Sequence, residues 1–152
     1  IKNQLYYEMP FKAAQILEKE LAIGNLAANQ EMLILLADSW LLSKEHEKAK
    51  SVLNEIIAKY DDAKTRLRLA QLYIEAEDWK NVINTLDTAL NNADATLISK
   101  ANLLIGIAQY HSNKLNKASR AFNLALSNTA TADQAKWWLE HIKNQIESEK
   151  QS

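Results

Sequence analysis

The sequence predicts an all-α protein, a solenoid of about nine short helices that ends in a C-terminal capping helix. Apolar residues recur three and four positions apart along nearly the whole chain, which is the spacing of one face of an α-helix. The chain holds only 2 Gly and 1 Pro in 152 residues, far fewer than folds of strands and turns use. The apolar pattern also returns at intervals of 33 and 36 residues, so the helices belong to a repeated unit.

The predicted helices follow one another with short connections. A first pair covers residues 2–8 and 11–23, is broken at Pro10 and is closed by Gly24 as a C-terminal cap. Connections of two to six residues make neighbouring helices run antiparallel. The remaining predicted helices cover residues 30–43, 46–59, 63–75, 79–91, 98–112, 115–128 and 131–147.

Each predicted helix pair places two small residues at a fixed spacing. In the first full pair, Ala37 is followed twelve positions later by Ala49, and four positions after that by Leu53. Two helices approach closely only where neither carries a bulky side chain, and the large residue fills the space beside that contact. The set returns as Ala70, Val82 and Leu86 and as Gly106, Ala118 and Phe122, and a half unit at the start has Ala13 and Leu17.

These residues resemble the tetratricopeptide repeat, a helix–turn–helix unit of about 34 residues with the pattern W-x2-L-G-x2-Y…A-x3-F…P. Arg66 replaces the opening aromatic residue of one unit, Gln109 replaces the tyrosine of another, and no unit keeps the closing proline. The resemblance implies a right-handed superhelix in a single domain over residues 1–152, which we expect to be a fragment of a longer protein. Its parts are a partial unit at 1–28, units at 29–61, 62–97 and 98–130, and the capping helix at 131–152.

Three segments also resemble a narrower bacterial family, tetratricopeptide proteins encoded with the energy-transduction components TonB, ExbB and ExbD. The segments are "YYEMPFKAAQILEKELAIG", "LRLAQLYIEAEDW" and "LLIGIAQYHSNKLNKASRAF". The resemblance implies an adaptor in the periplasm or at the cell envelope, with a cytoplasmic location as the alternative. Its partners would be proteins of an envelope complex.

Composition and motifs give no sign of an enzyme. A net charge of −1 offers no electrostatic footprint for nucleic acid, and the absence of Cys excludes disulfide and thiolate chemistry. The chain has no phosphate-binding loop and no metalloprotease motif. His46, His111 and His141 lie in different units, so we expect them to be solvated surface residues. We therefore expect no catalytic residues, no cofactor and no metal.

A repeat solenoid offers instead a concave groove lined by the first helix of each unit. Helix spacing places Glu31, Ile34, Asp38 and Leu41 on that face in the first full unit. It places Leu103 on the same face in the third full unit, with Lys100, Ile107 and Tyr110. The groove could hold an extended or helical peptide with apolar anchors. Alternatively, Ile34, Leu67 and Leu103 only pack one first helix against the next. The partner-binding residues we predict are Lys64, Leu67, Gln71, Ile74, Lys100, Ile107, Tyr110 and Trp137.

The doublet Trp137-Trp138 lies in the predicted capping helix. Trp138 falls on its apolar stripe, and Trp137 lies about 100° away around the helix. Trp137 is either partly buried against a neighbouring loop or an exposed contact for a partner or for a second copy of the chain in a homo-oligomer. Two functions remain open: an adaptor that binds a partner peptide, and a structural or oligomerisation module whose groove is filled by its own chain.

Overall fold

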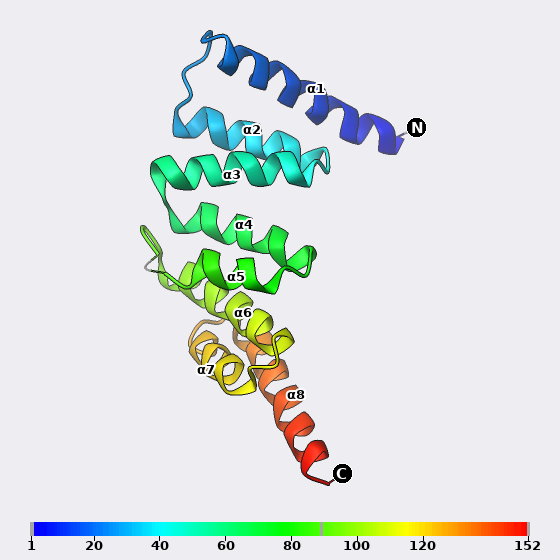
Figure 1. The fold of residues 1–152 in the computed structure, drawn as a ribbon, viewed down its shortest axis with the longest axis vertical. Coiled ribbons are helices and arrows are strands. Elements are labelled where there is room, and N and C mark those ends of the chain that lie inside the picture. The colour runs from blue at the N-terminus through cyan, green and yellow to red at the C-terminus, as the bar shows by residue number, and fades with distance from the viewer. Residues whose placement is uncertain (1, 89, 152) are drawn as a thin grey trace. The chain divides into compact units, whose positions relative to one another are not determined.

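A computed structural model describes residues 2–88 and 90–151 of the chain, and their side chains from residue 7 onward. Over these residues all regular structure is α-helical, which confirms the all-α prediction (Figure 1). The chain divides into two compact units, Ile1–Asp61 and Asp62–Ser152. Unit 1 contains α1 (Lys2–Ala22), α2 (Gln30–Leu42) and α3 (His46–Tyr60). Unit 2 contains α4 (Ala63–Glu75), α5 (Trp79–Leu86), α6 (Ala95–His111), α7 (Leu115–Ala125) and α8 (Ala132–Gln151).

The predicted break at Pro10 is wrong, because α1 continues through this residue as one helix (Figure 1). Proline removes a single helical hydrogen bond, and the contact of α1 with α2 stabilises the helix on both sides of that gap. The small residue where α1 contacts α2 is Ala14, which is fully buried. The predicted residue, Ala13, is exposed. The prediction for the half unit was therefore shifted by one residue.

Helix α5 ends at Leu86 although the periodicity predicted a helix to residue 91. Arg66, at the position of the missing aromatic residue, donates from its Nη1 to the carbonyl oxygen of Thr85 at 2.9 Å. This bond satisfies one of the carbonyl groups that the end of a helix leaves without a partner. In the connection that follows, the Asn91 carbonyl accepts the Ala63 N–H at 2.9 Å, beside the start of α4. The departure from the repeat pattern at Arg66 thus stabilises an early helix end.

The three turns that join the helices of each hairpin share one backbone geometry. Lys44, Glu77 and Asn113 have φ of 62°, 56° and 62°, in the left-handed region. The next residue in each turn donates its N–H to a carbonyl five positions earlier at 2.9 Å, as in a Schellman motif. These turns repeat at intervals of 33 and 36 residues, like the small residues. The repeat therefore persists in the backbone where the side chains differ.

The helix contacts follow the predicted small residues. Ala37 and Ala49 in unit 1, and Ala70 and Val82 in unit 2, are all fully buried. Gly106 of α6 lies so close to α7 that an added Cβ would be 2.5, 2.7 and 2.8 Å from three ring atoms of Phe122. In each of the three hairpins, α2–α3, α4–α5 and α6–α7, the two helices contact each other directly. Close helix packing at small residues is thus the common feature of all three.

We predict that Gly106→Ala lowers the free energy of unfolding of unit 2 by about 1–3 kcal/mol through overpacking. Phe122 is fully buried, so its ring can move away from the new methyl group only by displacing other core side chains. The higher helix propensity of Ala opposes this loss by up to about 1 kcal/mol. Urea denaturation measures the net effect. Because Phe122→Leu removes the ring, Gly106→Ala made in that background should cost less, and equal costs in both backgrounds would contradict the contact.

We also predict that Lys44→Gly and Glu77→Gly each stabilise the chain by up to about 1 kcal/mol, because glycine adopts positive φ without the steric cost of a Cβ. Both side chains are exposed and belong to otherwise regular turns. Asn113→Gly should gain less, since Asn already tolerates this conformation. Thermal unfolding followed by circular dichroism tests the series. A loss of stability in all three variants would show that these turns are not held in the left-handed region.

Candidate protein-interaction surface

The structure places the predicted groove residues in three different environments. In unit 1, Glu31 is exposed, while Ile34, Asp38 and Leu41 are half-buried on α2. In unit 2, the charged and amide residues predicted for the groove on α4 and α6 are exposed, and the other residues predicted for that groove are half-buried or buried. Lys64, Gln71 and Lys100 are exposed, Ile74, Ile107 and Tyr110 are half-buried, and Leu67 and Leu103 are buried.

Leu67 does not line an open groove, and this part of the prediction is corrected. It is 6 % exposed and belongs to a core cluster that includes Ala101 and Ala108 of α6. Helices α4 and α6 contact each other directly, so the side chain is covered by the following first helix. Leu103, at 7 %, belongs in the same way to a cluster with Ala135 and Ile142 of α8. Both leucines therefore pack one first helix against the next, which was the alternative to a place in the groove.

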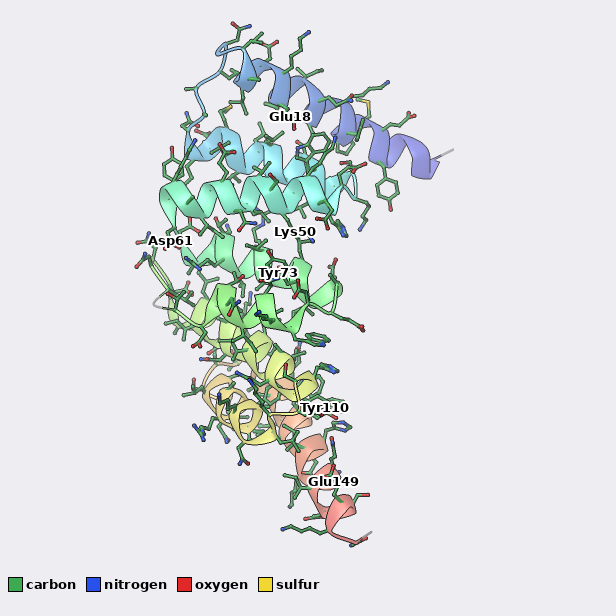
Figure 2. The ribbon with its side chains drawn as sticks, in the orientation of Figure 1. Glu18, Lys50, Asp61, Tyr73, Tyr110 and Glu149 are labelled. Carbon is green, nitrogen blue, oxygen red and sulfur yellow. The ribbon has the colours of Figure 1, made fainter. Side chains whose placement is uncertain are left out.

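Tyr110 joins α6 to α8 and is likewise not an open groove residue (Figure 2). Its hydroxyl donates to Oε1 of Gln145 at 2.7 Å and lies 2.9 Å from Nε2 of His141. Because the hydroxyl proton points to Gln145, Nε2 of His141 carries the proton of the second bond, an assignment made from the hydrogen-bond network. Ile107 packs against the same core cluster as Tyr110. Both residues therefore hold the last helix in place.

Around Tyr110 lies an array of aromatic and imidazole rings, which we name the aromatic surface. It runs from α5 across α6 to α8 and consists of Trp79, Tyr110, His111, Trp137, Trp138 and His141. Trp79 and His111 are stacked at 4.4 Å with an interplanar angle of 10°. Trp137 and His141 form a second stack at 5.1 Å and 8°. Trp138 stacks on the buried Phe122 at 5.5 Å, which ties the surface to the core of unit 2.

Sequence reasoning placed the histidines at the surface but missed these stacks. His111 and His141 are exposed, and His46 is half-buried. The stack of His141 on Trp137 has a local signal, because residues four apart lie on one helix face. The stack of His111 on Trp79 has none, since the two residues are 32 positions apart and on different helices. The two rings meet only because α5 contacts α6.

Trp137 occupies a repeat position that is buried in the two preceding first helices. It follows Leu103 by 34 residues, and Leu103 follows Leu67 by 36. Leu67 and Leu103 are 6 % and 7 % exposed, yet Trp137 is 59 % exposed. In the described part of the chain α8 is the last helix, so no further first helix covers Trp137. Helices α4, α6 and α8 are aligned here on the apolar residue two positions after Leu67, Leu103 and Trp137. That residue is Leu69, Ile105 or Leu139.

The same alignment shows that α8 differs from the earlier first helices at the residue where a hairpin packs. The small residue of the earlier first helices is Ala37, Ala70 or Gly106, and each is buried. At this position α8 carries Glu140, which is exposed. A second helix could not approach a glutamate as closely as an alanine or glycine. Helix α8 therefore lacks the small contact residue of the earlier first helices, and in the described part of the chain its Trp137 and His141 are exposed.

A shallow groove of about 330 Å³ lies elsewhere on α8, where this helix meets α7. Its floor includes Leu139, Ile142 and Ile146, and Lys143 and Lys150 stand among its lining residues. Ile146 follows Trp137 by nine residues, which places it about 180° around the helix. The groove and the aromatic surface are therefore separate features of unit 2.

The described residues contain neither a metal-binding cluster nor a membrane-spanning helix. No group of three or more His, Asp or Glu side chains in this part of the chain is placed to hold a metal ion. None of its helices has the length and hydropathy needed to cross a membrane.

The bonds of Tyr110 generate a local prediction. Tyr110→Phe removes both hydroxyl bonds, and each such bond contributes about 0.5–1.5 kcal/mol. Hydrogen exchange measured by mass spectrometry should show faster exchange in α8 and unchanged exchange in α4. Tyr60→Phe, at an exposed tyrosine of α3, is the matched control. If α8 keeps its protection in Tyr110→Phe, the hydroxyl does not hold this helix.

Comparisons with known proteins identify the fold. No protein-family model matches the chain, and neither does any curated protein. Three solved structures are similar over nearly the whole chain. "Crystal structure of MamA" has a TM-score of 0.66 at 15 % identity and covers 99 % of this chain and 96 % of that one. "MamA MSR-1 C2" has 0.65 at 16 %, covering 98 % and 90 %, and "MamA RS-1 ArsTM double mutant" has 0.66 at 14 %, covering 97 % and 92 %. The likeness confirms the predicted fold class, an all-helical solenoid of the tetratricopeptide type.

Proposed function

We propose that the chain is a non-enzymatic protein-interaction scaffold that binds a partner through the face of α8 carrying Trp137 and His141. The observation that carries the proposal is the exposure of Trp137, 59 % at a repeat position where Leu67 and Leu103 are 6 % and 7 % exposed. A large aromatic side chain that is held in place yet left open is the residue type that dominates protein interfaces. The solenoid fold supports this role, because such folds present extended binding surfaces.

The position of Trp137 indicates what kind of partner fits. In α4 and α6, the residues at this position, Leu67 and Leu103, are covered by the next first helix, which presents its own apolar stripe. A partner helix that lies across α8 in the same way would bury Trp137 and the ring of His141. Lys136 and Glu140, both exposed, lie along one edge of this face and could pair with charges on the partner segment. We therefore propose an amphipathic helix as the partner segment.

The exposed residues of the first helices form a second candidate surface. Lys64, Gln71 and Lys100 are exposed, and Ile74 is half-buried beside them in the repeat. Their side chains could bind a peptide through hydrogen bonds and charge. With Leu67 buried and Tyr110 bonded to α8, this surface keeps fewer of the apolar anchors that the groove prediction assumed. For this reason we place the main binding energy on α8.

We further propose that the partner belongs to a TonB, ExbB and ExbD-type complex in the bacterial envelope, which puts the chain in the periplasm. This part of the proposal rests on the resemblance of three segments of the sequence alone, among them residues 6–24 of the N-terminal region. A structural or oligomerisation role is the alternative function.

The test is binding of the purified chain to reconstituted ExbB, ExbD and TonB, measured by calorimetry. Trp137→Ala should weaken the interaction by about 2 kcal/mol or more, as truncation of a central interface residue does. Leu124→Ala is the matched control, because Leu124 is 60 % exposed on α7 and belongs to neither candidate surface.

The outcomes separate the parts of the proposal. Loss of binding in Trp137→Ala with full binding in Leu124→Ala supports the α8 face. Full binding in Trp137→Ala together with loss in a Lys64→Ala and Gln71→Ala double variant would move the site to the first helices. Absence of binding to all three components would remove the envelope assignment.

A further inference from the structure

A pocket of about 380 Å³ lies inside unit 2, where α5 ends and α6 begins. Helix α5 begins 33 residues after α3, at the equivalent position of the repeat, but it has 8 residues where α3 has 15. Helix α6 ends 36 residues after α4, also at the equivalent position, but it has 17 residues where α4 has 13. The pocket thus lies where one helix stops early and the next starts early. Both helices are internal to the sequence, so neither end of the chain shapes this pocket.

The floor of this pocket is apolar. Leu86 and Ala101 are 2 % and 3 % exposed, and Ile105 is half-buried. Ile98, which is 46 % exposed, also lines the pocket. Ile98, Ala101 and Ile105 lie within about 60° of one another around α6, so they form one face of this helix. A ligand that covers this face would remove apolar surface from water, and an aliphatic group is therefore favoured here.

The polar groups beside this floor favour a positive charge. Asp87 is exposed and Asn102 is half-buried, and both line the pocket. Within the described part of the chain, neither side chain has a hydrogen-bond partner. Asp87 is also the C-cap of α5, so its carboxylate lies at the negative end of the helix dipole. Arg66 donates to the Thr85 carbonyl instead, and no described Lys, Arg or His lines this pocket.

We propose that this pocket binds an aliphatic ammonium group. The hydrocarbon chain of the ligand lies over the apolar floor, and its ammonium bonds to Asp87 and Asn102. An ammonium is a compact cation with three donors, and the carboxylate and amide oxygens are acceptors for them. A metal ion would need more oxygen ligands than these and would leave the apolar floor uncovered.

The size of the pocket fits such a ligand, because small-molecule sites typically have volumes of about 300–1,000 Å³. The same chemical group occurs in the lysine side chain of a partner protein and in a free alkylamine. The site is separate from the α8 face, so the two proposals stand or fall independently.

Titration of the isotope-labelled chain with hexylammonium chloride, followed by backbone amide NMR, tests the site. We expect saturable shift changes at residues 86–88 and 98–105, with a Kd on the order of 1 mM for a ligand of so few atoms. Hexan-1-ol has the same hydrocarbon chain without the charge. It should bind at least about fivefold more weakly, because a hydrogen bond to a charged group contributes more than one between neutral groups.

Two variants at exposed side chains probe the pocket without disturbing the core. Asp87→Asn should weaken hexylammonium binding at least about fivefold and leave hexan-1-ol binding unchanged. Ile98→Lys should abolish saturable binding, because the new side chain brings its own ammonium to the pocket. Asp133→Asn is the matched control, since it removes the same charge from an exposed position on α8. Circular dichroism should show unchanged helical content in all three variants.

A capped peptide, acetyl-Ala-Lys-Ala-amide, distinguishes the two sources of the ammonium. Saturable shifts with either probe at the pocket residues support the proposal. Tighter binding of the peptide than of hexylammonium assigns the pocket to lysine side chains, and weaker binding assigns it to free amines. Three results would each overturn the proposal. These are shift changes that avoid the pocket, equal binding of hexylammonium and hexan-1-ol, and full hexylammonium binding in Asp87→Asn or Ile98→Lys.

Discussion

Close approach of paired helices at small residues is the constraint on which the rest of the structure depends. Gly106 shows it most clearly, because even one added carbon would collide with the ring of Phe122. Once two helices lie this close, the turn between them must be short and its backbone must reverse direction sharply, as the positive φ at Asn113 shows. The large residue beside the contact then fixes the rotation of each helix. The faces left for neighbouring helices, and for partners, follow from that rotation.

This constraint explains how much could be predicted from the sequence. The small residues and their spacing are local signals, so the helices and their pairing could be read directly. Burial of Leu67 could not, because a helix wheel gives a direction but does not say whether another helix stands there. The continuity of α1 through Pro10 depended likewise on a contact with α2. The left-handed turn at Glu77 was hidden because the residue is not glycine.

The candidate site was predicted only in part, for a related reason. Trp137 was identified from its offset against Trp138, and the structure places it on the exposed side. Tyr110 was assigned to an open groove because the position of α8 over α6 is not encoded in either helix alone. A repeat protein uses equivalent positions for different purposes along its length. The same register that buries Leu103 inside unit 2 leaves Trp137 at its surface.

The exposure of Trp137 is a consequence of its position in the repeat, and one measurement tests this directly. Oxidative footprinting with mass spectrometry reports the solvent access of each of the 4 tryptophans in the purified chain. We expect Trp137 to be oxidised fastest and Trp40, which is 1 % exposed, to be oxidised slowest, with Trp79 and Trp138 between them. Protection of Trp137 to the level of Trp40 in the purified chain would contradict the claim that this repeat position is left open on α8.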